Sequence, residues 1–222
     1  NGGVQKLPCT VRDYVFSSFN ENQAEKCFAS LNSSFSEVWW YYPSSGSEEI
    51  DRYVVFNYVQ NIWYVGNLNR TAWIDRGVHN LPIAASTDNY LYNHETGSDD
   101  GSTSPAQAIA AYIESSQFDI GEGDQFSFIR RVIPDLTFRN STALAPVVNM
   151  TLQSRNFPGG AYTNADASAI TRSAIVPVEQ FTQDANIRLR GRSMSLKVDS
   201  AATGVAWRLG APRIEIRPDG RR

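Results

Sequence analysis

Hydrophobic and polar residues alternate in short runs along much of the chain. Successive side chains of a β-strand point to opposite faces, so this alternation predicts strands with one buried face. Ile187 and Leu189, for example, alternate with Arg188 and Arg190. The runs are rich in aromatic and β-branched residues and are bounded by Gly, Pro, Asn and Asp. The pattern therefore predicts an all-β fold.

The runs of the first half lie close together along the chain. Residues 36–66 contain three of them separated by turns, which predicts an antiparallel meander of propeller-blade type. Further strands are predicted at residues 11–19, 71–75, 81–86 and 90–95. Short strands at regular spacing are typical of a propeller blade, a sandwich or a barrel.

Residues 20–32, NENQAEKCFASLN, have helical spacing instead. Asn20 can cap the first turn, and apolar residues recur at intervals of three and four. These residues are Ala24, Cys27, Phe28 and Leu31. We therefore expect one short helix near the N-terminus.

The segment 96–105, TGSDDGSTSP, reads as a linker or an exposed loop. Residues 1–100 carry 6 Lys and Arg against 12 Asp and Glu, a net charge of −6, whereas residues 101–222 carry 14 against 11, a net charge of +3. We therefore expect a propeller-blade-like domain at 1–100 and a β-sandwich at 101–222. A balance of +3 is too small to predict nucleic-acid binding by itself.

The sequence contains no run of about 18 apolar residues, so no membrane-spanning helix is expected. The chain does not begin with Met and has no visible signal peptide, so we expect a fragment or a processed product of a longer protein. Cys9 and Cys27 do not match a zinc pattern, and we interpret them as free thiols, with a disulfide as the alternative.

Motifs of catalysis are few in this sequence. It lacks a GxSxG elbow, a P-loop and a strand-linked GxGxxG, and the acidic segment 98–104 lacks the ligand spacing of a calcium loop. His94 beside Glu95 can form an acid–base pair, although a structural role is the commoner one. A glycosidase needs two carboxylates, and the candidates are Asp51, Asp75, Glu114 and Asp119. We expect a solvated loop rather than a metal site at 98–104.

Aromatic side chains are concentrated in residues 36–66. Strand geometry places Trp39 and Tyr41 on one face and Trp40 and Tyr42 on the other, and Trp63 follows in the third run. Such a strand is buried on both faces, or buried on one face and docked against a partner on the other. We favour core or interface over a platform on which sugar rings stack.

Arginines alternate with other residues near the C-terminus. Arg188, Arg190 and Arg192 can contact DNA phosphates or a partner. Other basic residues lie nearby in the sequence, namely Lys197, Arg208, Arg213, Arg217, Arg221 and Arg222. A solvated sheet face has the same pattern, and we favour a solvated face or a protein interface.

The order of several motifs resembles a known family over nearly the whole chain. These motifs are PCTVRDYVF, SEVWWYYPSSGSEEIDRYVVFNY, NIWYVGNLNRTAWIDRG, AYIESSQFDIGEGDQFSFIRRVIPDL, SRNFPGG and RLRGRSMSLKV followed by GVAWRLGAPRIEIRPDGRR. The chain resembles the C-terminal part of the tail nozzle or tail-hub proteins of short-tailed bacteriophages, also called packaged-DNA stabilisation proteins. Members of that family are several times longer.

The resemblance implies a propeller-type β fold with further β-domains, assembled as a homo-oligomeric ring, typically a hexamer. It implies no catalysis and no cofactor. It also implies a place in the virion tail after synthesis in the host cytoplasm. The implied partners are portal or adaptor proteins, a tail fibre or spike, and passing DNA. Retention of packaged DNA until ejection is the expected function. A carbohydrate-binding or host-receptor-binding β-module and a glycoside hydrolase are the alternatives.

Overall fold

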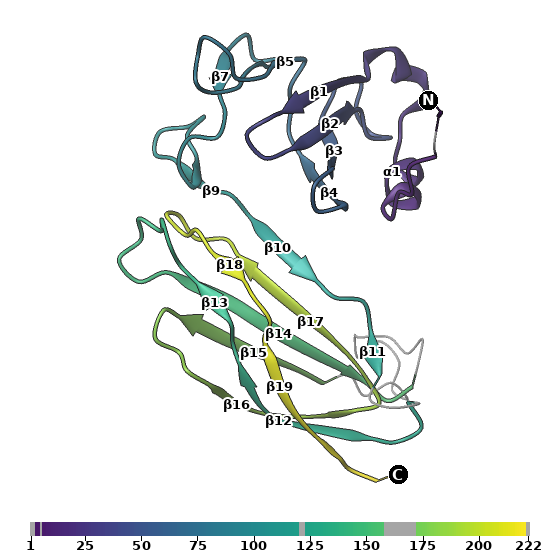
Figure 1. The fold of residues 1–222 in the computed structure, drawn as a ribbon, viewed down its shortest axis with the longest axis vertical. Helices are drawn as coiled ribbons and strands as arrows, with labels where there is room; N and C mark the ends of the chain where they lie inside the picture. Colours follow the sequence, from purple (N-terminus) through teal and green to yellow (C-terminus); the bar gives the residue numbers. More distant parts are fainter. Residues whose placement is uncertain (1–2, 5, 120–122, 158–171, 221–222) are drawn as a thin grey trace. The chain divides into compact units, whose positions relative to one another are not determined.

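The computed structural model describes residues 3–4, 6–119, 123–157 and 172–220 (Figure 1). The chain divides into two compact units, residues 1–97 and 98–222. The division falls inside the polar segment 96–105. Each unit is built mainly from antiparallel strands, and two short helices precede the first strand. The prediction of a mostly β fold is therefore confirmed.

The first unit contains two antiparallel sheets. The larger sheet has the order β1-β2-β3-β4 and forms the meander, which includes the three strands predicted within residues 36–66. Its strands are β1 (Phe28–Asn32), β2 (Glu37–Tyr42), β3 (Arg52–Asn57) and β4 (Ile62–Asn67). The smaller sheet contains β5 (Ala72–Ile74), β6 (Ile83–Ala85) and β7 (Leu91–Asn93), all at predicted positions.

The strand predicted at residues 11–19 is wrong, because α1 (Arg12–Ser17) occupies this segment. Val11 and Val15 are spaced by four residues, so the helical turn places both on one side. Val15 belongs to a hydrophobic cluster against which Val11 and Phe19 pack. Tyr14 and Phe16, which suggested alternation in the sequence, are exposed.

The helix predicted at residues 20–32 is only partly correct. Asn20 accepts a hydrogen bond from the Asn22 backbone N–H and caps the 3₁₀ helix η1 (Glu21–Lys26). Cys27 is already extended, and β1 pairs with β2 from Phe28–Tyr41 to Asn32–Glu37. The continuous ladder pairs one edge of β1 with β2, and this tertiary pairing overrides the weak helical spacing.

The second unit contains two main sheets that share one hydrophobic core. One has the order β10-β17-β14-β15, with β11 also paired to β17, and the other has the order β16-β12-β19. Buried side chains from both sheets form the shared cluster, among them Ile129, Met150, Leu152, Leu189 and Val198. Alternation at Ile187 and Leu189 buries both of these side chains, as predicted.

The described part of the second unit contains twelve strands, several of them only two residues long. The strands of the second unit are β8 (Asp99–Asp100), β9 (Gln107–Ala108), β10 (Ala111–Glu114), β11 (Phe118–Asp119), β12 (Ser127–Ile133), β13 (Leu136–Thr137), β14 (Val147–Arg155), β15 (Arg172–Glu179), β16 (Ala185–Gly191), β17 (Ser193–Ser200), β18 (Arg208–Leu209) and β19 (Arg213–Pro218). Within the described residues, no helix is both long enough and apolar enough to cross a membrane.

Candidate functional site

The first face of the meander is an aromatic core. Trp39 and Tyr41 leave only 8% and 0% of their surface exposed. The Trp39 ring stacks on Tyr53 and Trp73, with centroids 4.6 and 5.5 Å apart. Stacked and buried rings have no free face for a ligand, so these two residues stabilise the first unit.

The second face is covered by the chain's own N-terminal segment. Trp40 and Tyr42 belong to one cluster with Val15 of α1, as the two-face pattern predicts. Trp40 stacks on Trp63 at 5.7 Å, and the Trp63 indole N–H donates to the Pro8 carbonyl over 2.8 Å. Residues 8–19 of the same chain therefore cover part of this face.

Polar side chains contact the aromatic core, among them the buried Glu37 and Asn32 and the exposed Glu95. Buried Glu37 accepts a hydrogen bond from the Trp39 indole N–H over 2.9 Å. Asn32 donates through Nδ2 to Glu95 Oε1 over 2.8 Å. Burial near Glu37 raises the pKa of Tyr64, and partial burial of the carboxyl raises the pKa of Glu95. These contacts connect the rings of the core to a hydrogen-bond network.

His94 and Glu95 do not form the acid–base pair that the sequence suggested. His94 Nε2 accepts from Arg70 Nε over 2.9 Å, and its ring lies 4.6 Å from the Trp73 ring. Burial, and then the charge of Arg70, lower the pKa of His94 to about 4. A neutral imidazole that accepts from a guanidinium is a structural group, and it links β7 to the segment before β5.

The four candidate carboxylates of a glycosidase are not brought together. Asp51 accepts from the backbone and hydroxyl of Ser44, and Asp75 accepts from the Ser33 backbone N–H, so each stabilises a loop. Glu114 and Asp119 belong to the other unit. No cluster of three or more metal-ligating side chains occurs within the described residues. Cys9 and Cys27 are free thiols.

The strongest candidate site is the outer face of the sheet β16-β12-β19, here called the arginine face. Leu189, Ile129 and Ile216 are cross-strand neighbours that point inward. Their neighbours point outward, so Arg190, Phe128 and Arg217 form one row across the three strands. The arginines of the face are Arg130, Arg131, Arg188, Arg190, Arg213 and Arg217.

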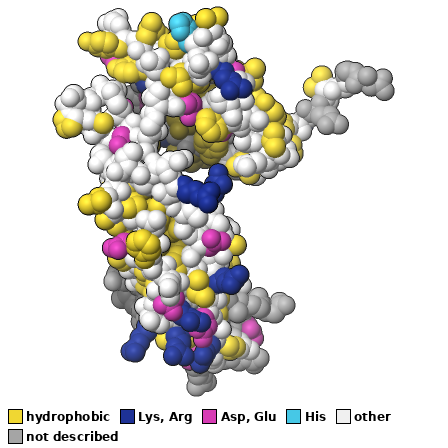
Figure 2. Space-filling model, turned by 60° about the vertical axis from the view of Figure 1, so that its left-hand side comes forward, with side chains coloured by type: hydrophobic (Ala, Val, Ile, Leu, Met, Phe, Trp, Pro, Cys, Tyr) yellow, Lys and Arg dark blue, Asp and Glu magenta, His cyan; other side chains and the backbone are white. Residues whose placement is uncertain are grey.

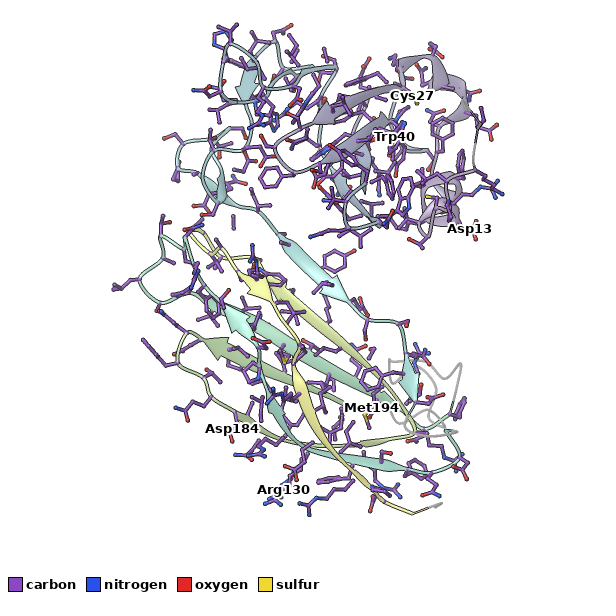
Figure 3. All side chains as sticks on the ribbon, viewed as in Figure 1. Asp13, Cys27, Trp40, Arg130, Asp184 and Met194 are labelled. Carbon is purple, nitrogen blue, oxygen red and sulfur yellow. The ribbon has the colours of Figure 1, made fainter. Side chains whose placement is uncertain are left out.

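A β-bulge in β12 increases the charge of this face. The register shifts between Ile129 and Arg131, so Arg130 is the extra residue of the bulge and is exposed. Without the bulge, strict alternation would place either Arg130 or Arg131 on the core side. Figure 3 shows Arg130 on the outer side of the sheet, and Figure 2 shows Lys and Arg side chains gathered near one end of the second unit.

Carboxylates and an aromatic ring orient several of these arginines. Asp219 pairs with Arg190, and Glu215 lies 3.3 Å from Arg131 and 2.9 Å from Arg217. Asp184 pairs with Arg131 at 3.5 Å. The hydrogen bond from Arg217 lowers the pKa of Glu215. Six guanidinium groups with three carboxylates leave the face positively charged.

Phe126 makes cation–π contacts with two of the predicted arginines. The guanidinium carbons of Arg190 and Arg192 lie 4.0 and 4.7 Å from its ring centroid. Arg192 follows β16 and is therefore beside the arginine face rather than in its rows. Guanidinium groups held by cation–π contacts are preorganised to bind carboxylate or phosphate oxygens in a bidentate manner.

Sequence reasoning identified only part of the arginine face. It predicted Arg188, Arg190 and Arg192 as possible contacts and placed Arg213 and Arg217 near them, but it did not include Arg130 and Arg131. The alternation of Arg213 and Arg217 with Ile214 and Ile216 was visible in the sequence. The pairing order that brings three distant strands together was not visible in the sequence.

No protein-family model matches the chain, and no curated protein matches it either.

Proposed function

We propose that the protein is a structural component of the tail of a short-tailed bacteriophage, in its nozzle or hub, which helps to retain packaged DNA until ejection. The order of sequence motifs supports this assignment. The arginine face is the structural observation that supports the proposed role in retaining DNA. Its positive charge suits a stable contact with an acidic partner or with DNA. Stacking of Trp39 and its neighbours into the core argues against the carbohydrate-binding alternative.

The finer architecture follows from the same proposal. The meander β1–β4 corresponds to a propeller blade, and the two sheets of the second unit correspond to a β-sandwich. Copies of the chain assemble as a ring, a hexamer, between the portal or adaptor and the tail fibre or spike. The arginine face contacts a neighbouring tail protein, and the acidic residues 1–100 repel phosphates and let DNA slide.

The first experiment uses particles of the phage that encodes this sequence. Mass spectrometry of density-purified virions should detect peptides from residues 36–66 and 187–200 in constant ratio to the portal protein. Native mass measurement of the assembled tail should give six copies. Purified virions without these peptides would contradict the proposal.

A second experiment tests the arginine face in the assembly. The double variant Arg188→Glu and Arg213→Glu changes two exposed side chains and should reduce incorporation into particles at least tenfold. Arg139→Glu is the matched control, because Arg139 is exposed in the same unit but lies outside the face. Equal incorporation of both variants would remove the arginine face from the proposal.

A further inference from the structure

The first unit contains an apolar groove between α1 and the meander. Its volume is about 450 Å³, within the range of about 300–1,000 Å³ that is usual for small-molecule sites. The floor includes Ala29 and Trp40, which are cross-strand neighbours in β1 and β2. Val15 and Phe16 of α1 form the opposite wall. Figure 3 shows Trp40 and Cys27 in the part of the unit that contains α1.

The apolar lining is incompletely covered by the protein. Phe16 lines the groove although 64% of its surface is exposed. Ala29, on the floor, is exposed as well. An exposed ring beside an exposed apolar strand position is unfavourable in water. A bound apolar group would remove both surfaces from solvent.

One charged group of the lining defines the head group that the bound molecule must offer. Arg12 lines the groove and is exposed, and its guanidinium lies 5.9 Å from the Phe16 ring centroid. A positive charge therefore stands beside the apolar wall that Phe16 forms.

We propose that this groove binds a small amphipathic anion, with an apolar chain or ring against Phe16, Ala29 and Trp40 and an acidic head group at Arg12. The apolar lining selects the body of the ligand, and the guanidinium selects a carboxylate or sulfonate over a cation. This site is independent of the proposed role in a phage tail. It concerns a different unit from the arginine face.

The test measures binding of dodecanoate to the full chain by isothermal titration calorimetry. Dodecyltrimethylammonium has the same apolar chain with a cationic head and should bind at least tenfold more weakly. Ala29→Trp should abolish dodecanoate binding, since the new ring fills the floor from an exposed position. Arg12→Glu should weaken it about tenfold, which corresponds to about 1.4 kcal/mol.

Matched controls come from the same segments of the chain. Leu31→Trp adds the same ring two residues along β1, where the side chain is exposed and outside the groove. Lys6→Glu makes the same charge reversal as Arg12→Glu, and Lys6 does not line the groove. Both controls should bind dodecanoate as the parent chain does.

Thiol labelling gives a second readout that does not depend on the variants. Cys9 and Cys27 are free and line the groove, so dodecanoate should slow their alkylation by a maleimide. Absence of dodecanoate binding overturns the proposal. Equal affinity for the cationic amphiphile, or unchanged binding by Ala29→Trp, overturns it as well.

Discussion

The two units of this chain build their cores from different side chains. In the first unit, rings such as Trp39 and Tyr41 pack against one another. In the second, aliphatic side chains and methionines such as Leu152 and Met150 fill the space between two sheets. Among the described residues, the buried polar side chains of the second unit are serines, whereas those of the first include Glu37 and Arg70.

The difference between an aromatic and an aliphatic core explains where each unit places its charged side chains. Aromatic side chains leave polar edges that need partners, so the first unit encloses titratable groups such as Glu37 and His94. The aliphatic core of the second unit needs none, and its charges lie on the outer arginine face. We therefore expect the stability of the first unit to depend on pH and that of the second to respond weakly to salt.

The largest effect is expected for Trp39→Ala. It removes a buried ring that stacks on Tyr53 and Trp73 and leaves Glu37 without its indole donor. The free energy of unfolding of the first unit should fall by about 3–5 kcal/mol. Urea titration followed by fluorescence measures it, since Trp207 is the one tryptophan of residues 98–222 and reports the second unit separately.

Trp40→Ala is the comparison on the other face of the same strand. Trp40 is half-buried under the N-terminal segment, so the loss should be smaller than for Trp39→Ala. An equal or larger loss for Trp40→Ala would contradict the assignment of the first face as the principal core. A shift of the Trp207 transition in either variant would show that the units do not unfold independently.

Leu152→Ala should have the next largest effect, this time in the second unit. Leu152 is fully buried in the shared core, and its truncation should cost about 2–5 kcal/mol. The transition reported by Trp207 should move, and the transition of the other tryptophans should not. Ile175→Ala on the neighbouring strand, where the side chain is 65% exposed, should change stability by less than about 0.5 kcal/mol.

Acidification should weaken the first unit selectively. The pKa of His94 falls from 6.5 to about 4 on folding, so the unfolded state binds the additional proton between these values. Stability is therefore present above pH 6.5 and is lost as the pH falls towards 4, by on the order of 1–2 kcal/mol after allowance for the partly exposed ring.

The contribution of Glu95 to the stability of the first unit changes with pH in the opposite direction to that of His94. The raised pKa of Glu95 means that the folded state holds the proton more tightly, and the stability from this group is lost as pH rises through the folded pKa. Urea titrations at pH 7, 5.5 and 4.5 separate the two, because His94→Gln should flatten only the decrease between 6.5 and 4. The same pH dependence in the parent chain and in His94→Gln between pH 6.5 and 4 would contradict the structural role of the Arg70–His94 pair.

The smallest effects are expected on the arginine face. Asp219→Ala removes the carboxylate that pairs with Arg190, and both side chains are partly exposed. The second unit should lose less than about 1 kcal/mol, and high salt should reduce the difference. A loss of several kcal/mol, measured through Trp207, would show that this pair is part of the core rather than of a binding surface.

Local patterns of the sequence predicted most of the strands, because alternation depends only on which face is buried. Ile187 and Leu189 are buried and Arg188 is exposed, as expected. The two faces of β2 were also predictable from alternation alone. The same rule failed at residues 11–19, where apolar residues recur every four positions as well as in apparent alternation. Packing of Val15 into the hydrophobic cluster stabilises the helix α1 there.

The sequence by itself determined that the chain is mostly antiparallel β and that the rings of β2 point to both faces. Tertiary structure decided that residues 8–19 cover the second face and that β1 joins the meander. It also decided that a bulge at Arg130 and the pairing of β16, β12 and β19 bring arginines into one surface. Strand pairing is a long-range choice, since each edge can accept many partners and burial of the shared core selects one.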